Sequence, residues 1–239
     1  MGSQLAHPQK IALATPWDLF TTTPPSVIEQ EAFPEVRSNL APQGEIILAI
    51  SEDMTLAHIN KTYALPSGYV PPNLNKITGV PTFREQYLRE DTLPYLYQLF
   101  GAAAEAGFRL SVLSAYRSYF VQETTFSWWV KQTGWEAAAR GSAFPGHSEH
   151  QLGTTVDLAL DQPDFQTFSQ SPVAAWVAKN AARFGFIVSY QEGKERITGY
   201  IYEPWHIRFV GVDLATKLYR EGNTLEEYFR KNTLGEAHR

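Results

Sequence analysis

The first clear periodic pattern lies between residues 85 and 106, where apolar residues recur at helical spacing. They are Leu88, Leu96, Leu99, Phe100 and Ala103. This spacing predicts a helix that buries one face. Pro94 lacks a backbone N–H, so it must either kink this helix or lie in the first turn of a second one. Gly107 suits the C-terminal end of the helix.

Further helices are indicated in three later segments. Residues 122–139 form an aromatic-rich helical stretch. Ser171-Pro172 combines an N-cap residue with a proline at the first helical position, which predicts the start of another helix. Near the end of the chain, Thr224 and Glu227 have the spacing of a capping box and predict a short terminal helix.

Two segments alternate between apolar and polar residues with a period of two, which predicts strands. In residues 153–160, Asp157 points away from the apolar face, and we expect this strand to be half buried. In residues 205–210, His206 and Arg208 lie opposite the apolar face. The two apolar faces comprise Val156, Leu158, Leu160, Trp205, Ile207 and Phe209. Short strands interleaved with helices, without regular βαβ spacing, predict an α+β fold in which helices flank a small antiparallel sheet.

The first 45 residues differ in composition from the rest of the chain. They contain six of the 15 prolines, which remove backbone donors and disfavour helix interiors. We therefore expect residues 1–45 to form a proline-rich N-terminal arm or linker. Residues 46–239 are expected to form the folded domain, beginning with a strand at Ile46–Ile50.

The composition of the 239 residues limits the possible functions. Hydrophobic residues make up 44% and aromatic residues 13%, which is enough for a sizeable core. The net charge of −5 argues against a nucleic-acid partner, because such proteins need a basic face. There is no cysteine, so disulfides, thiolate nucleophiles and Cys-based zinc sites are excluded, and histidines and carboxylates must hold any metal.

The N-terminus has neither the charged region nor the apolar region of a secretory signal. The longest aliphatic runs are also far shorter than the ~20 residues that span a bilayer. The Met1-Gly2-Ser3 start is typical of a recombinant chain, so we expect that a native signal or membrane anchor is missing from this sequence.

Two of the six histidines lie beside the alternating segments. His150 shortly precedes the first segment, and His206 lies within the second. If the two predicted strands pair, His150, Asp157 and His206 converge on one side of a sheet. Two imidazoles and one carboxylate match the three-ligand arrangement of a catalytic zinc site. The alternative for each histidine is an ordinary hydrogen-bonded side chain without a metal.

Glu203 lies three residues before His206, close enough to act as a general base on water. His147 is a competing ligand, although Pro145-Gly146 indicates that it belongs to the loop before the first alternating segment. Other hydrolase patterns are absent from the chain, namely Ser-x-x-Lys, Gly-x-Ser-x-Gly and His-Glu-x-x-His.

Three motifs occur along the chain in the order typical of one protein family. Residues 148–157 (SEHQLGTTVD) are similar to S-x-H-x-x-G-x-A-x-D, with Thr155 in place of the usual small alanine. Residues 203–206 (EPWH) resemble E-x-W-H, and residues 114–118 (SAYRS) resemble S-x-Y-R-S. On these motifs the chain resembles the VanY-like zinc D-alanyl-D-alanine carboxypeptidases, together with the related LD-carboxypeptidases and D-Ala-D-Ala dipeptidases. Softer matches extend the likeness over residues 54–213.

The resemblance implies that Zn²⁺ is held by His150, Asp157 and His206. It also implies that Glu203 is the base and later the proton donor, and that Arg117 stabilises the oxyanion or holds the substrate. A fixed guanidinium suits that task because it carries its charge at every working pH. Without the motif, Arg117 would be interpreted as a surface or carboxylate-paired arginine.

Three further residues are candidate substrate contacts: Ser148, Gln122 and Tyr116. The alternatives are a capping serine, a solvated glutamine and a half-buried tyrosine. We expect Trp205 to belong to the core rather than to a substrate platform, and Arg208 to pair with a carboxylate.

The function favoured by the sequence is zinc-dependent removal of the C-terminal D-alanine from peptidoglycan stem peptides. We expect a monomeric enzyme that works outside the cytoplasm, either secreted, periplasmic or on the cell surface. The alternatives are LD-carboxypeptidase action on tetrapeptide stems, endopeptidase action, and a non-catalytic cell-wall-binding module. Glu203 favours an enzyme, because a binding module would have little reason to keep a general base.

Overall fold

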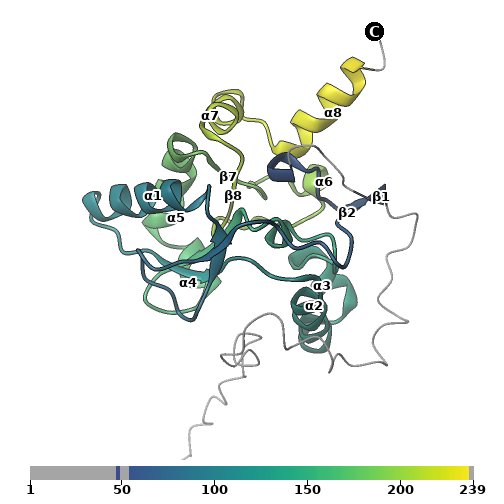
Figure 1. Cartoon of the computed structure of the whole chain (residues 1–239), viewed down its shortest axis with the longest axis horizontal. Coiled ribbons are helices and arrows are strands. Elements are labelled where there is room, and N and C mark those ends of the chain that lie inside the picture. Colours follow the sequence, from purple (N-terminus) through teal and green to yellow (C-terminus); the bar gives the residue numbers. More distant parts are fainter. Residues whose placement is uncertain (1–46, 49–53, 237–239) are drawn as a thin grey trace, which may run out of the picture.

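Four short strands form the central sheet in the order β5-β6-β8-β7, and every neighbouring pair is antiparallel. The strands are β5 (Ser111–Ser114), β6 (Thr155–Ala159), β7 (Phe186–Val188) and β8 (His206–Phe209). The computed structural model describes residues 47–48 and 54–236 of the chain (Figure 1). It confirms the predicted α+β fold, with a small antiparallel sheet flanked by helices.

Helices surround this sheet (Figure 1). The α-helices are α1 (Leu93–Glu105), α2 (Tyr119–Thr133), α3 (Trp135–Gly141), α4 (Phe165–Ser169), α5 (Pro172–Asn180), α6 (Glu195–Thr198), α7 (Val212–Glu221) and α8 (Leu225–Glu236). The 3-10 helices are η2 (Met54–Leu56), η3 (Glu149–Leu152) and η4 (Ala181–Phe184). No helix in the described part of the chain combines the length and the apolar character that a membrane crossing requires.

Two smaller strand pairs lie beside the central sheet. β1 (Ile47–Leu48) pairs with β2 (Tyr63–Ala64) in parallel, and β3 (Leu74–Lys76) pairs with β4 (Tyr87–Arg89) in antiparallel orientation. The predicted arm over residues 1–45 lies outside the described residues, so the domain boundary at residue 46 stays a prediction.

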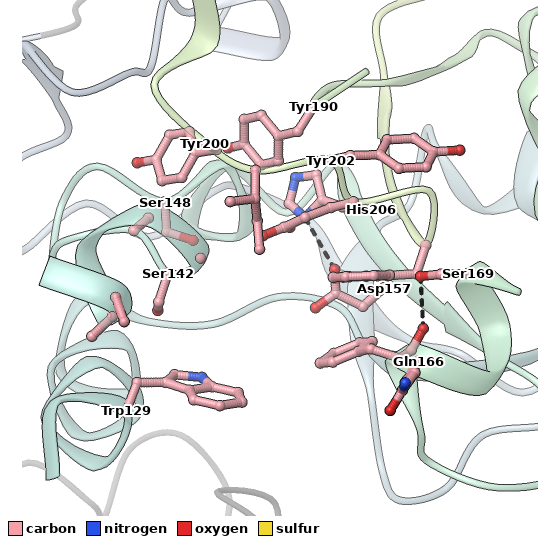
Figure 2. Close-up of a pocket in the computed structure, with 18 of the residues that line it drawn as sticks. Trp129, Ser142, Ser148, Asp157, Gln166, Ser169, Tyr190, Tyr200, Tyr202 and His206 are labelled. Atoms are coloured by element: carbon pink, nitrogen blue, oxygen red, sulfur yellow. Dashed lines mark hydrogen bonds and ion pairs between the residues drawn. The ribbon is translucent and has the colours of Figure 1, made fainter. Parts of the chain in front are cut away.

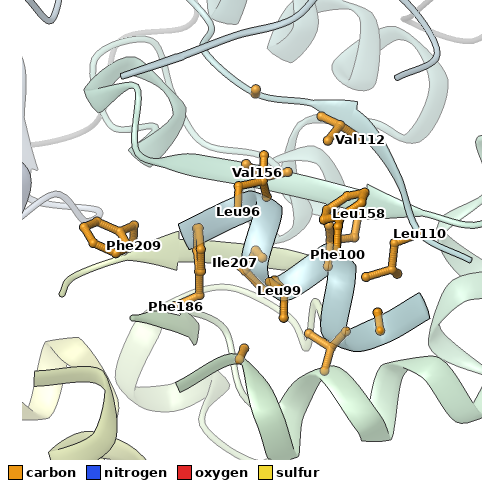
Figure 3. Close-up of a cluster of buried hydrophobic side chains, with 14 of the residues drawn as sticks. Leu96, Leu99, Phe100, Leu110, Val112, Val156, Leu158, Phe186, Ile207 and Phe209 are labelled. Carbon is orange, nitrogen blue, oxygen red and sulfur yellow. The ribbon is translucent and has the colours of Figure 1, made fainter. Parts of the chain in front are cut away.

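The main hydrophobic core lies between α1, α5 and one face of the central sheet (Figure 3). Its sheet residues alternate along the strands, as expected when one face of each strand is apolar. Among its fully buried members are Leu96, Leu99, Val156, Leu158, Phe186 and Ile207. This packing fixes which face of β6 and β8 is left for polar side chains.

The predicted helix over residues 85–106 is only partly present. Residues 93–105 form α1, and Pro94 lies in its first turn, where no intrahelical N–H is needed. Residues 87–89 instead form β4, so the prediction of a helix there is wrong. Leu88 is fully buried in the main core, so it fitted the helical pattern although it belongs to a strand.

Strand β6 is buried on both faces, so the prediction of a half-buried strand is wrong. Thr155 is 0% exposed and Asp157 is 3% exposed, although both lie opposite the apolar face. On the same face of the sheet, Arg208 of β8 is the register partner of Thr155 and contacts the N-terminal segment of the domain. Its Nη2 donates to the carbonyls of Thr55 and Ala57 at 3.0 and 2.7 Å.

The remaining helix predictions are confirmed. α2 and α3 cover residues 119–141, and α5 begins at Pro172 after Ser171. The capping box before α8 is complete: the backbone N–H of Thr224 donates to Glu227 Oε2 at 2.7 Å, and the N–H of Glu227 donates to Thr224 Oγ1 at 3.1 Å.

Candidate active site

Asp157 and His206 lie opposite each other on β6 and β8, on the face that points away from the main core. His150 lies on η3, and the turn at Gly153 leads from η3 into β6. Gly153 has a left-handed backbone (φ 71°), and an added Cβ would lie 2.9 Å from Pro71 Cγ, so this turn requires glycine. The structure brings His150, Asp157 and His206 into one buried cluster, in which one ligand atom of each lies within 4.8 Å of the others.

The hydrogen bonds of the two imidazoles turn one nitrogen of each ring toward Asp157. His150 Nδ1 donates to the carbonyl of Ala115 at 2.6 Å, and its Nε2 lies 3.1 Å from Asp157 Oδ2. His206 Nε2 lies 2.9 Å from Glu149 Oε2, and its Nδ1 lies 3.0 Å from Asp157 Oδ1. The available nitrogens are therefore Nε2 of His150 and Nδ1 of His206.

This donor set fits a zinc ion. His150 Nε2 is buried and has no hydrogen-bond partner of good geometry, which is costly for a polar atom unless a ligand satisfies it. Two imidazole nitrogens and one carboxylate oxygen are ligands that zinc accepts, and three protein ligands leave a coordination position open. His150, Asp157 and His206 are all less than 5% exposed, so the cluster is shielded from bulk water.

The charges around the cluster also favour a cation. Burial would raise the pKa of Asp157, but the two imidazoles outweigh burial and hold this pKa far below its usual range. Burial opposes a charge on His206, yet the hydrogen bonds that its ring donates to Asp157 and Glu149 raise its pKa to about 10. The carboxylates of Asp157 and Glu149 thus stabilise a positive charge on the His206 ring. A divalent cation can replace the proton on Nδ1 of this ring.

Glu203 lies next to the cluster at the end of the loop before β8. Its Oε2 is 4.0 Å from His206 Nδ1, and its side chain is 9% exposed. Burial raises the pKa of Glu203 to about 8, although His206 opposes this shift. A carboxylate with a pKa near neutrality can both accept and release a proton at neutral pH.

Arg117 lies beside Asp157. Its Nη2 is 3.6 Å from Asp157 Oδ2, and its backbone N–H donates to the carbonyl of His150 at 3.3 Å. Burial lowers the pKa of Arg117, whereas Asp157 and Glu203 raise it. An arginine remains charged under these conditions, so a fixed positive group lies beside the cluster.

The cluster and both charged residues line a cavity of about 560 Å³ (Figure 2). Trp129 of α2 lies on one side of this cavity, and Gln166 and Ser169 of α4 lie on the other, with Asp157 and His206 between them. Six aromatic side chains contribute to the lining: Trp129, Phe165, Tyr190, Tyr200, Tyr202 and Trp205. The cavity is large enough for a short peptide.

The three predicted substrate contacts are placed differently. Ser148 lines the cavity and also caps η3, because its Oγ accepts from the backbone N–H of His150 at 3.4 Å. Gln122 is buried rather than solvated, and its Nε2 donates to the carbonyl of Ala143 at 2.6 Å. Gln122 and Tyr116 are not among the described residues that line the cavity.

Two other expectations concerned His147 as a competing ligand and Trp205 as a core residue. His147 is not part of the cluster, and its Nδ1 lies 2.8 Å from the carbonyl of Asn60. Trp205 packs against the core as expected, but it also stacks on Phe165 with ring centroids 4.5 Å apart and lines the cavity. The expectation that Trp205 is a core residue alone is therefore incomplete.

Sequence reasoning missed Glu149, which contacts His206 through Oε2 and Arg208 through Oε1. The Arg208 guanidinium donates from Nη1 at 2.8 Å, which confirms that this residue pairs with a carboxylate. The available signal was indirect: an arginine expected to pair with a carboxylate needs an acid close by, and Glu149 lies next to His150 in the motif.

Comparison with known proteins gives consistent results. The family model "VanY: D-alanyl-D-alanine carboxypeptidase" matches residues 85–212. YodJ of Bacillus subtilis is 38% identical over 183 residues, which are 74% of this chain and 67% of that relative. A D-alanyl-D-alanine carboxypeptidase of Enterococcus faecalis is 40% identical over 144 residues, 56% of this chain, and the match spans 53% of that relative's length.

Solved structures show the same likeness. The LD-carboxypeptidase LdcB has a TM-score of 0.68 at 38% identity, covering 74% of this chain and 86% of that one. A Zn(II) complex of the vancomycin-resistance D,D-pentapeptidase VanY has a TM-score of 0.64 at 33% identity, covering 74% and 99%. The family match covers more than half of the chain and includes all three residues of the buried cluster. The chain therefore belongs to the VanY family of D-alanyl-D-alanine carboxypeptidases.

Proposed function

We propose that this protein is a zinc-dependent carboxypeptidase that removes the C-terminal D-alanine from peptidoglycan stem peptides. The observation that carries the proposal is the buried carboxylate of Glu203 beside the cluster of His150, Asp157 and His206. A base, a metal-binding donor set and a peptide-sized cavity then occur together in a member of a carboxypeptidase family.

In this proposal His150, Asp157 and His206 hold the zinc ion. Zinc bound there supplies a Lewis acid that polarises the scissile carbonyl and acidifies water. The zinc-bound structure of the VanY D,D-pentapeptidase supports the choice of metal. The hydrogen bonds that the two imidazoles donate to the Ala115 carbonyl and to Glu149 hold the rings so that Nε2 of His150 and Nδ1 of His206 are available.

Glu203 has the role of general base and then general acid. Its carboxylate removes a proton from the water that attacks the scissile carbonyl carbon, and it gives that proton to the nitrogen of the departing D-alanine. The C–N bond breaks, and the products are a shortened peptide carboxylate and free D-alanine. The raised pKa of Glu203, caused by burial, matches a group that must take up and release a proton near neutral pH.

Arg117 has the role of binding negative charge on the reacting peptide. Its position beside Asp157 supports this assignment, because the guanidinium is fixed at the edge of the cluster and lines the cavity. A charge that is already oriented stabilises the developing oxyanion without reorganisation. Ser148 is a further proposed contact with the peptide backbone.

LD-carboxypeptidase action on tetrapeptide stems is the second candidate function. The similarity to LdcB, with a TM-score of 0.68, favours this alternative. The two reactions release the same D-alanine and need the same base and metal. They differ in the residue before the scissile bond, which is D-alanine in one substrate and an L-centred diamino acid in the other.

Release of D-alanine from defined peptides distinguishes these functions. We expect the zinc-loaded protein to release D-alanine from a stem pentapeptide faster than from a tetrapeptide, and chelation to abolish the release. Faster cleavage of the tetrapeptide would establish the LD-carboxypeptidase alternative instead. If the zinc-loaded protein cleaved neither peptide, the catalytic proposal would fail in favour of a binding module.

The location and assembly of the protein are further parts of this proposal. Peptidoglycan stem peptides of the cell wall lie outside the cytoplasmic membrane, which supports an extracytoplasmic enzyme. One chain supplies every proposed site residue, which supports action as a monomer. Cell fractionation tests the location, and size-exclusion chromatography with light scattering tests the assembly.

A further inference from the structure

The carboxylate of Glu149 lies between two residues of β8, His206 and Arg208. Glu149 Oε2 is 2.9 Å from His206 Nε2 and accepts a hydrogen bond from Ser189 Oγ at 2.7 Å. Glu149 Oε1 accepts from Arg208 Nη1 at 2.8 Å. The Glu149 and His206 side chains are 5% exposed and the Arg208 side chain is fully buried, so water does not compete for these bonds.

Arg208 is itself held in place from the opposite side. Its Nη2 donates to the backbone carbonyls of Thr55 and Ala57, at 3.0 and 2.7 Å. The guanidinium is planar and its donors are fixed relative to one another, so contacts at Nη2 determine where Nη1 points. The segment around η2 thereby fixes Arg208, and Arg208 fixes one oxygen of Glu149.

We propose that Glu149 is a positioning residue that holds the ring of His206 in the state that binds the metal. The proposal rests on the assignment of His206 as a metal ligand. A cation can bind His206 only after one ring nitrogen gives up its proton. Glu149 has only acceptor oxygens toward Nε2, so Nε2 keeps its proton and Nδ1, which faces Asp157, becomes the ligand atom.

Without Glu149 as the acceptor, the proton of the His206 ring could lie on Nδ1 instead of Nε2. Asp157 Oδ1 lies 3.0 Å from Nδ1 and would accept a hydrogen bond from it, so a ring protonated only at Nδ1 would be stable but unable to bind the metal through Nδ1. Glu149 is not among the described residues that line the cavity. Its effect must therefore act through His206 rather than through contact with the substrate.

The variant Glu149→Gln tests this inference, because an amide has one acceptor and one donor. If the amide oxygen accepts from Arg208, the NH₂ group faces His206 Nε2 and favours the tautomer that cannot bind the metal. If the amide is reversed, its NH₂ group faces the guanidinium, so two donors oppose each other and this orientation is disfavoured. We expect the zinc affinity to fall by about 10–100-fold, measured by competition with a chromogenic chelator.

Glu226→Gln is a matched control. Glu226 Oε2 lies 2.7 Å from His58 Nε2, which is the same kind of carboxylate–imidazole pair outside the cavity. We expect this variant to bind zinc as tightly as the unmodified protein, even if its stability decreases. Equal loss of zinc affinity in both variants would show a general effect of destabilisation and would overturn the proposal.

A second measurement does not depend on the folding of a variant. In the zinc-loaded unmodified protein, nitrogen NMR of the histidine rings should show a proton on Nε2 of His206 and none on Nδ1. A proton on Nδ1 with the metal on Nε2 would overturn the proposal. So would Glu149→Gln protein that folds and binds zinc like the unmodified protein.

Failure of this inference can be distinguished from failure of the proposed function. If the unmodified protein binds zinc and releases D-alanine while Glu149→Gln has the same zinc affinity, only the role of Glu149 is lost. If the unmodified protein binds no zinc, the proposed function fails first, and the inference fails with it.

Discussion

Asp157 and His206 are direct partners in the register of β6 and β8, and their Oδ1 and Nδ1 atoms lie 3.0 Å apart. The two residues are 49 positions apart in the chain, so strand pairing rather than a local turn brings them together. A shift of one residue in this register would turn one of the two side chains toward the main core and separate it from the other. The packing of Val156 and Ile207 against α1 therefore also specifies the position of the metal-binding atoms.

Replacement of His206 with alanine should abolish zinc binding. The change removes Nδ1, one of the three donor atoms, and the loss of affinity should exceed the ~10–100-fold typical of losing a partner that only supports a ligand. Zinc content after gel filtration measures the effect. His147→Ala is the matched control, because His147 is also buried but bonds to the Asn60 carbonyl, and its zinc content should remain normal. Loss of zinc from the control would make His147 a ligand.

Replacement of Glu203 with glutamine should leave zinc binding intact and reduce turnover. Glutamine has a similar shape but cannot take a proton from water, so we expect kcat to fall by about 10²–10⁴-fold. The rate of D-alanine release and the zinc content must be measured on the same sample. Normal turnover with bound zinc would refute the role of Glu203 as the base.

Replacement of Arg117 with methionine should reduce kcat/KM by about 10²–10³-fold, because a fixed charge beside the reacting carbonyl is lost. Arg117→Lys should recover only part of the rate, since an ammonium group lacks the planar set of donors of a guanidinium. Both variants should retain zinc. If Arg117→Met lost zinc and activity in equal measure, Arg117 would instead be a residue that supports Asp157, which lies 3.6 Å away.

Much of the fold follows from local sequence signals. The alternation around Asp157 and His206 predicts β6 and β8, and Pro94 marks the first turn of α1. These signals are strong because each depends on neighbouring residues alone. Leu88 could not be assigned in this way, because a buried residue at helical spacing from α1 is equally compatible with β4.

The site was predictable where strand pairing was the only long-range assumption. The convergence of His150, Asp157 and His206 needs only that β6 and β8 are neighbours. The contact of Arg208 with the segment around Thr55 was not predictable, because this segment is distant in the chain. The contact of Glu149 with His206 was indicated only indirectly. Hydrogen bonds from Arg208 to backbone carbonyls leave no pattern in the sequence of that segment.

The carboxylate of Glu226 should make the stability of the domain depend on pH, away from the metal site. Burial would raise the pKa of Glu226, but hydrogen bonds from His58, Asn60 and Arg230 outweigh burial and lower it from 4.5 to about 2. A folded-state pKa below the unfolded value means that the folded protein favours the ionised form. The resulting stabilisation is fully present above about pH 4.5 and is lost as the pH falls toward 2.

Glu226→Gln should therefore lower the free energy of unfolding by about 1.5–3 kcal/mol at pH 7, the range for hydrogen bonds to a charged group. The difference from the unmodified protein should shrink between pH 5 and pH 3, because the unfolded chain takes up a proton on Glu226 below about pH 4.5 whereas the folded protein resists protonation down to about pH 2. Urea unfolding of the metal-free proteins at about pH 7, 5 and 3 measures this trend. Glu136→Gln provides a control at an exposed carboxylate of α3, where we expect a difference within about 0.5 kcal/mol. A difference for Glu226→Gln that stayed constant from pH 7 to pH 3 would show that the side chain stabilises α8 by packing rather than by its charge.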